Sequence, residues 1–149
     1  MFAVPPNTIA LPASPAAAHP VRVATEVARD RARWAHLLRY DPQERFSALV
    51  EATEDFEIWL LSWLPGQYTD THDHDGSAGA FTVINGELTE RVVKPADGDR
   101  AASEVVHTVS AGQSRAFGPR YVHQVRNDGI DPAVTIHVYR PHRAIRIVG

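Results

Sequence analysis

Hydrophobic and polar positions divide the chain into an N-terminal helical part and a longer part built of short strands. Between residues 21 and 38, apolar side chains recur at a spacing that suits one helical face, and residues 42–50 are compatible with a second short helix. From Phe56 onward, short apolar runs alternate with segments rich in Gly, Asp and Pro. The sequence therefore predicts one or two helices followed by about seven strands.

The predicted strands are short and regularly spaced, which is typical of an all-β sandwich or barrel. They are expected at residues 56–64, 80–84, 88–93, 105–109, 113–117, 122–125 and 133–139. Asn85-Gly86 indicates a two-residue hairpin turn, because both residues tolerate a positive φ. The chain shows no internal repeat and no second domain. We expect one domain over residues 21–149, preceded by a flexible arm at residues 1–20.

Composition narrows the classes of function. The 149 residues carry a formal net charge of −3 without a clustered basic face, which argues against nucleic-acid binding. No apolar run approaches the roughly 18 residues of a membrane helix. Prolines interrupt the N-terminal segment, where a signal peptide needs an unbroken apolar run, so we expect a cytoplasmic protein. The absence of cysteine excludes disulfides and thiolate ligands, so a metal must be held by His, Asp, Glu or backbone oxygen.

His72 and His74 are the first candidates for metal ligands. Two residues apart on a strand, they point to the same face, and both imidazoles can reach one ion. A His-x-His pair alone is weak evidence, but His123 lies in a second segment of similar character. Glycines and an asparagine stand at set distances around these histidines, namely Gly66, Gly86, Gly112, Gly118 and Asn127.

This arrangement is similar to the two-motif signature of the cupin superfamily and covers about residues 56–140. The resemblance implies an all-β cupin fold, a small β-barrel of the jelly-roll type, with the one or two predicted helices at its N-terminal side. In common cupins an acidic ligand follows the second histidine by five residues, and Gly79 takes that position here. The site would then consist of three neutral histidines without a carboxylate. Imidazole suits Fe, Zn, Cu and Ni, so the ligand type leaves the metal open.

The chain also resembles the cysteine dioxygenase family of thiol dioxygenases. The segments that carry the resemblance are WLPGQYTDTHDHDGSAGAF (63–81), NGELTE (85–90), HQVRN (123–127) and PAVTIHVY (132–139). The resemblance implies an Fe(II) cofactor on His72, His74 and His123. Gly79 also stands where some animal members have a cysteine that is crosslinked to the active-site tyrosine, so that thioether cannot form here.

The resemblance further implies a catalytic group on one late strand, at Thr135, His137 and Tyr139. Alternate positions of a strand share a face, so all three side chains would enter the barrel. Tyr139 would donate a hydrogen bond near the reacting atoms, His137 would hold its hydroxyl, and Thr135 would fix the tautomer of His137.

The sequence identifies the substrate-binding residues less directly than the candidate metal ligands. Arg45 is the nearest match to the family's carboxylate-binding arginine; if Ser47 takes that place instead, Arg140 or Arg120 is the alternative. Tyr68 is a candidate for the mouth of the pocket. Other polar and aromatic residues receive structural interpretations: Glu87 and Glu90 on a solvated strand face, Arg115 as a surface charge, and Trp59 and Trp63 in the core.

The function implied by the resemblance is that of a non-haem iron thiol dioxygenase. It would add O2 to the sulfur of a small thiol acid, with L-cysteine giving cysteine sulfinate, or a relative such as 3-mercaptopropionate, as substrate. The alternatives are a cysteine-oxidising cupin of a biosynthetic pathway with a further-oxidised product, a non-catalytic metal-binding cupin, and a Zn or Ni cupin with isomerase or hydrolase chemistry. The expected partners are the thiol and O2, in a monomer or small homo-oligomer.

Overall fold

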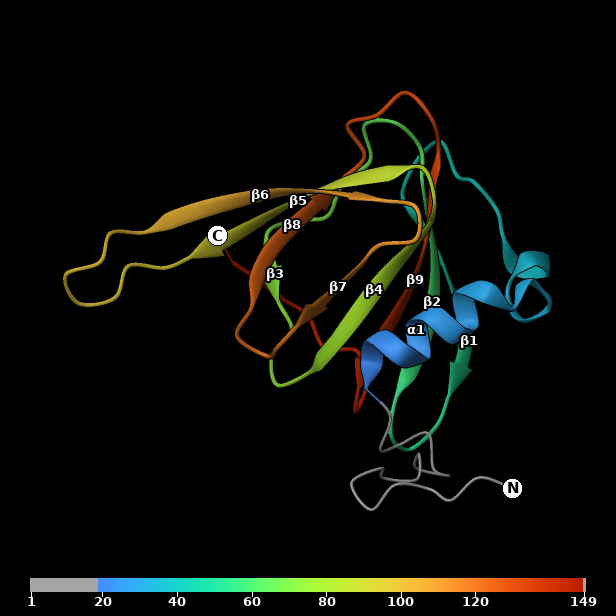
Figure 1. Cartoon of the computed structure of the whole chain (residues 1–149), viewed down its shortest axis with the longest axis horizontal. Helices are drawn as coiled ribbons and strands as arrows, with labels where there is room; N and C mark the ends of the chain where they lie inside the picture. The colour runs from blue at the N-terminus through green and yellow to red at the C-terminus, as the bar shows by residue number, and fades with distance from the viewer. Residues whose placement is uncertain (1–18, 149) are drawn as a thin grey trace, which may run out of the picture.

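A computed structural model describes residues 19–148, which form two five-stranded antiparallel sheets (Figure 1). The first sheet has the order β1-β2-β9-β4-β7 and the second the order β10-β3-β8-β5-β6. The helix is α1 (Pro20–Arg29), and the strands are β1 (Phe46–Ala52), β2 (Glu57–Trp63), β3 (His72–Asp73), β4 (Ala78–Asn85), β5 (Glu87–Lys94), β6 (Ser103–Ser110), β7 (Ser114–Phe117), β8 (Val122–Arg126), β9 (Ala133–Arg140) and β10 (Arg146–Ile147). The all-β architecture expected from the sequence is confirmed.

The predicted N-terminal arm lies almost wholly outside the described residues, and Pro20 already belongs to α1. In residues 19–148 no helix is both long and apolar enough to span a membrane. The single-domain organisation of residues 21–149 stays a prediction.

The predicted helix over residues 21–38 is shorter than its apolar spacing indicates. α1 ends at Arg29 and is followed by two short 3-10 turns, η2 (Arg31–Arg33) and η3 (Ala35–Leu37). Trp34 is buried, and its indole N–H donates to the Ala28 carbonyl over 3.2 Å. This contact ties the chain back to the last turn of α1, so burial of one aromatic side chain outweighs continuation of the helix.

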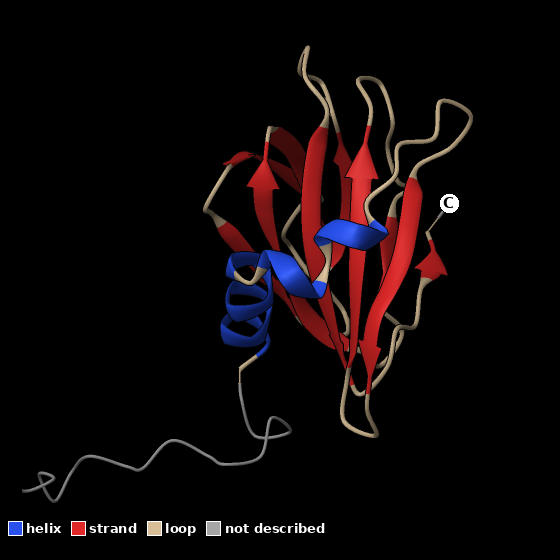
Figure 2. Ribbon diagram, turned by 90° about the vertical axis from the view of Figure 1, so that its right-hand side faces the viewer, coloured by secondary structure: helices blue, strands red, loops and turns tan. Residues whose placement is uncertain are grey.

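The helix covers the outer face of the first sheet, where it lies across β4 and β9 (Figures 1 and 2). Its Val23, Ala24 and Val27 share one apolar cluster with the alternate residues of β9 that face outward, Val134, Ile136 and Val138. The intervening residues of β9 face a second cluster inside the barrel. Both faces of β9 are therefore buried, and its buried residues include the polar Thr135 and His137.

The second predicted helix, over residues 42–50, is wrong. The chain forms β1 instead, and this strand pairs antiparallel with β2 at the edge of the first sheet. A tight turn joins the two strands, in which the Thr53 hydroxyl accepts N–H bonds from Asp55 and Phe56. Ala, Leu and Glu in this segment favour a helix, but backbone pairing with β2 overrides that weak local preference.

The hairpin predicted at Asn85-Gly86 is also wrong. β4 pairs with β7 and β9, whereas β5 pairs with β6 and β8, so the two strands flanking this turn lie in different sheets. Of the two turn residues, Gly86 has a positive φ, of 76°, and Asn85 does not. A Cβ at Gly86 would lie 2.6 Å from the Pro132 carbonyl oxygen. The dipeptide is a tightly packed corner at which the chain crosses from one sheet to the other.

Gly79 lies on β4 between β7 and β9, opposite Phe117 and Tyr139. A Cβ built there would lie 2.0 Å from the Val138 carbonyl oxygen and 2.9 Å from the Phe117 ring. The first of these contacts is with backbone, which cannot rotate away. The position that carries an acidic ligand in common cupins therefore has no room for a side chain in this protein.

Gly79→Ala is expected to destabilise the fold by about 1–3 kcal/mol, the usual cost of overpacking a filled core. Thermal and denaturant unfolding of the purified variant would measure the change. Gly118→Ala is the matched control, because a Cβ at Gly118 meets nothing within 4 Å. Equal stability of the two variants would contradict the packing argument.

Candidate metal centre

Three histidines from two neighbouring strands meet inside the barrel. His72 lies on β3, His74 follows that strand directly, and His123 lies on β8, where it pairs with His72. One potential ligand nitrogen from each residue lies within 4.8 Å of the other two. The ring centroids are 4.7 to 5.0 Å apart, and all three side chains are buried. Within residues 19–148, no carboxylate oxygen joins this group.

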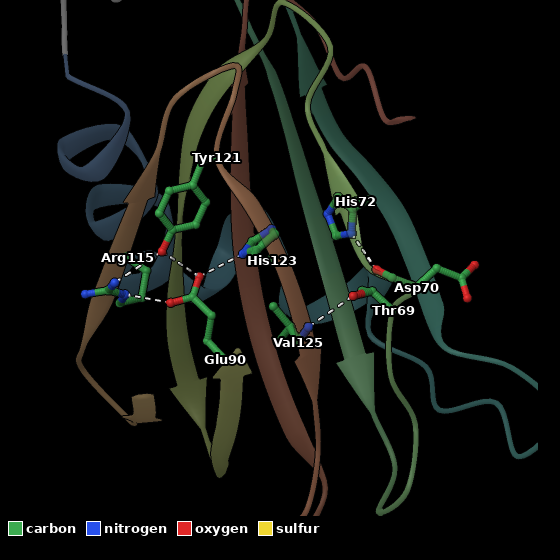
Figure 3. Close-up of polar contacts among 8 residues, drawn as sticks. All are labelled: Thr69, Asp70, His72, Glu90, Arg115, Tyr121, His123 and Val125. Carbon is green, nitrogen blue, oxygen red and sulfur yellow. Dashed lines mark hydrogen bonds and ion pairs between the residues drawn. The ribbon is translucent and has the colours of Figure 1, made fainter. Parts of the chain in front are cut away.

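Two of the three imidazoles are oriented by hydrogen bonds at Nδ1. The Nδ1 of His72 lies 2.7 Å from the Asp70 carbonyl oxygen, and that of His123 lies 2.7 Å from Glu90 Oε2 (Figure 3). A carbonyl can only accept, so Nδ1 of His72 carries the proton and Nε2 keeps a free lone pair. This is the usual way in which an outer partner fixes the tautomer of a ligating histidine.

The third imidazole is held by packing. The ring of His74 lies on the ring of Phe117, with centroids 3.9 Å apart and an interplanar angle of 22°. Its Nδ1 is buried and has no hydrogen-bond partner among residues 19–148. The cluster thus contains a buried polar atom that the protein leaves unsatisfied, which is unusual in a site built for structure alone.

Burial keeps His72 and His74 neutral. It lowers the pKa of His72 to about 4, with His123 adding to the effect and the Asp70 carbonyl opposing it. It lowers the pKa of His74 to about 2, with further contributions from His123 and His72. Neutral imidazoles offer nitrogen lone pairs at neutral pH, so this donor set fits a divalent transition-metal ion.

Glu90 is not on a solvated strand face, as its sequence context indicated, but is fully buried. Besides its contact with His123, it accepts hydrogen bonds from Arg115 Nε at 2.7 Å and from the Tyr121 hydroxyl at 3.2 Å. Burial alone would raise the pKa of Glu90, but the hydrogen bonds from His123 and Arg115 outweigh it and the pKa is lowered. Arg115 is likewise not an isolated surface charge.

The burial of Glu90 follows from strand alternation. Leu88, Glu90 and Val92 are the inward-facing residues of β5, whereas Glu87 is exposed. A glutamate in register with two core residues is a signal that the sequence contains and that our interpretation of the sequence missed.

Thr135, His137 and Tyr139, which form the late-strand group, lie beside the three histidines. The Trp63 indole N–H donates to Thr135 Oγ1 at 3.0 Å, and this oxygen lies 2.8 Å from His137 Nε2. The rings of His137 and Tyr139 are stacked with centroids 6.2 Å apart, and Tyr139 lies 6.0 Å from the ring of His74. Trp63 is buried, as expected, whereas Trp59 is only half-buried.

A small cavity of about 180 Å³ opens next to His72, and both Arg45 and Tyr68 line it. The guanidinium of Arg45 lies over the Trp63 ring at 5.0 Å, and its Nη1 donates to the Tyr68 carbonyl oxygen at 3.3 Å. In the part of the chain that the structure describes, Arg45 Nε is buried without a hydrogen-bond partner. The Tyr68 side chain is exposed and stands at the rim of the cavity.

The structure does not bring the alternative carboxylate-binding residues to this cavity. Ser47 is exposed on β1, and Arg120 is exposed between β7 and β8. Arg140 follows Tyr139 on β9, so strand alternation directs its side chain to the opposite face. Of the arginines considered from the sequence, Arg45 is the one that lines a cavity together with a candidate ligand.

Solved structures from three bacteria share the fold. A Thermus thermophilus protein is 28% identical, with a TM-score of 0.60 over 72% of this chain and 93% of its own. A protein with a double-stranded β-helix domain from Klebsiella pneumoniae is 24% identical, with a TM-score of 0.63 over 77% and 93%. An RmlC-like cupin from Desulfovibrio desulfuricans is 25% identical, with a TM-score of 0.54 over 70% and 90%.

The family assignment rests on the sequence itself. The profile of the family described as cysteine dioxygenase type I matches residues 17–146, which include all three candidate ligands and nearly the whole of the two sheets. Together with the two-sheet cupin fold, this match shows that the chain belongs to the cysteine dioxygenase type I family.

Proposed function

We propose that this protein is a non-haem Fe(II) thiol dioxygenase that acts on a small thiol acid, with L-cysteine as substrate and cysteine sulfinate as product. The observation that carries the proposal is the convergence of three buried histidines without a carboxylate among their potential ligand atoms in the described residues. Family membership supports the class of reaction.

The reaction is balanced without a further reductant. A thiolate and O2 give a sulfinate, in which two S–O bonds form and the O–O bond breaks. Sulfur loses the four electrons that O2 gains, and both oxygen atoms remain in the product. A protein that catalyses it must bind the two reactants side by side and supply no electrons of its own.

A bound ferrous ion would attract the thiolate and activate O2. His72, His74 and His123 would hold the ion. Because imidazole ligands add no negative charge, the charge of the ion would remain available to attract an anionic sulfur.

Arg45 is the residue that we assign to the substrate carboxylate. Its stacking on Trp63 and its bond to the Tyr68 carbonyl orient the guanidinium, and its buried Nε lacks a partner. A planar guanidinium suits a carboxylate because it donates two parallel hydrogen bonds. The cavity of about 180 Å³ is smaller than the roughly 300–1,000 Å³ of pockets for drug-sized ligands, which limits the substrate to a small molecule.

Tyr139 is the residue that we assign to hydrogen bonding at the reacting atoms. Burial raises the pKa of its phenol to about 12, so Tyr139 keeps its proton and remains a donor at neutral pH. Thr135 receives the Trp63 N–H, and its own hydroxyl hydrogen is then directed to His137 Nε2. This arrangement places the single proton of neutral His137 on Nδ1 and keeps the ring beside Tyr139 in one orientation.

The protein loaded with Fe(II) is expected to consume one O2 per L-cysteine oxidised and to yield a product heavier by two oxygen atoms. An oxygen electrode and mass spectrometry, applied to a panel of small thiols that includes 3-mercaptopropionate, would measure both. His74→Ala is expected to lose iron and activity together, because two imidazoles hold the ion poorly.

Each alternative function has its own outcome in this experiment. A non-catalytic metal-binding cupin would consume no O2 with any thiol, and a Zn or Ni cupin would be active without O2. An enzyme of a biosynthetic pathway would give a more highly oxidised product. Full activity of iron-free His74→Ala would contradict the proposed metal centre itself.

Arg45→Gln is expected to raise KM for the thiol acid by about 10- to 100-fold, the range set by a charge-assisted hydrogen bond of about 1.5–3 kcal/mol. The effect on kcat should be small, because the carboxylate is bound before and during the reaction. Initial rates of O2 uptake would measure it. Arg120→Gln removes an exposed charge outside the cavity and is the matched control; a rise in KM there, with Arg45→Gln unchanged, would move the carboxylate site to Arg120.

Tyr139→Phe is expected to keep iron and lower turnover by about 10- to 100-fold, because it removes a hydrogen-bond donor and leaves the ring packing intact. Metal analysis and steady-state rates on the same preparation would separate the two effects. Unchanged turnover would exclude Tyr139 from the reaction.

A further inference from the structure

We propose that Glu90 is a positioning residue that acts on the metal through His123. Its carboxylate lies one hydrogen bond behind that histidine and gives the three-histidine centre a negative charge that no ligand supplies. The proposal rests on metal binding in the proposed function. It does not depend on which thiol is the substrate.

The surroundings of Glu90 show that its carboxylate is charged. The side chain is fully buried, and a buried charge persists only when it is paired and hydrogen-bonded. Arg115 Nε lies 2.7 Å from Oε1, while the Tyr121 hydroxyl and His123 Nδ1 lie 3.2 Å and 2.7 Å from Oε2 (Figure 3). Arg115 and the Tyr121 hydroxyl donate to the carboxylate, which stabilises its ionised form.

This geometry fixes the proton of His123. An ionised carboxylate cannot donate, so Nδ1 carries the hydrogen of the 2.7 Å bond and Nε2 has the lone pair. A carboxylate that accepts from Nδ1–H draws the proton toward itself, which raises the electron density at Nε2 and strengthens it as a ligand.

The three candidate ligands therefore differ in their outer partners. His72 has a neutral carbonyl at Nδ1, His74 has no partner at Nδ1, and His123 has a carboxylate. We infer that His123 is the strongest donor of the three and that Glu90 stabilises the more highly charged state of the metal.

Arg115 and Tyr121 reduce the negative charge that Glu90 presents to His123. Arg115 also donates from Nη2 to the Tyr121 hydroxyl at 3.2 Å, so the two residues and Glu90 form a closed set of contacts. The Tyr121 hydroxyl shares Oε2 with His123 and withdraws charge from it. Removal of this hydroxyl should concentrate charge on Oε2 and act on the metal in the opposite direction to the loss of Glu90.

Glu90→Gln removes the charge and keeps the shape. We expect its dissociation constant for Fe(II), measured by competition with a chelator, to rise about 10- to 100-fold. We also expect the reduction potential of the bound iron, measured by redox titration, to rise, because the oxidised ion loses an anionic neighbour. Glu87→Gln, an exposed glutamate on the same strand, should leave both quantities unchanged.

Tyr121→Phe tests the opposite change, because it removes a hydrogen-bond donor from Glu90 Oε2 and keeps the ring packing. We expect the reduction potential to fall in this variant. Unfolding of each protein without metal would establish that it is folded; if Glu90→Gln does not fold, the direction of the Tyr121→Phe shift decides alone. Unchanged potentials, or shifts in the same direction in both variants, would overturn the role of Glu90. Failure of the unmodified protein to bind Fe(II) would instead overturn the proposed function.

Discussion

The pairing of β3 with β8 is the interaction on which the candidate metal centre depends. It consists of a single residue pair, His72 opposite His123, and a two-residue strand has almost no stability of its own. Its position is set from both sides. The Thr69 N–H donates to the Val125 carbonyl oxygen on β8. The Thr69 hydroxyl accepts from the Val125 N–H (Figure 3). Arg146 on β10 pairs with the Asp73 carboxylate, so contacts before His72 and between the two histidines hold them in place.

The interior of the barrel combines apolar packing with groups that would normally seek water. Phe81 and Phe117 are part of an apolar cluster, and both also lie against candidate site histidines. Imidazoles tolerate this environment because they can lose their charge, which is the physical meaning of the low pKa values of His72 and His74. Two charged residues lie near different histidines of the centre: Arg45 lines the same cavity as His72, and Glu90 forms a hydrogen bond with His123.

The strands after residue 56 were largely predictable, because their alternation and their turn residues are local signals. His72 and His74 were candidates because of their His-x-His spacing, whereas His123 and the group Thr135, His137 and Tyr139 were identified through the resemblance to the cysteine dioxygenase family. β3 and β10 were missed because they are two-residue strands whose partners are distant in sequence. β1 was missed because its local composition favours a helix, although it pairs with the neighbouring strand β2. The corner at Asn85-Gly86 was misinterpreted because a turn dipeptide does not reveal whether its flanking strands pair with each other.

The absence of an acidic ligand and the burial of Glu90 have a common physical explanation. A carboxylate in the place of Gly79 would take a coordination position and cancel charge that attracts a thiolate, and the Val138 carbonyl leaves no room for it. A carboxylate behind His123 occupies no position at the metal, and Arg115 balances its charge on the outer side. In the proposed centre the negative group would lie one hydrogen bond away from the ion. There it would strengthen a ligand without competing with an anionic substrate for the ion.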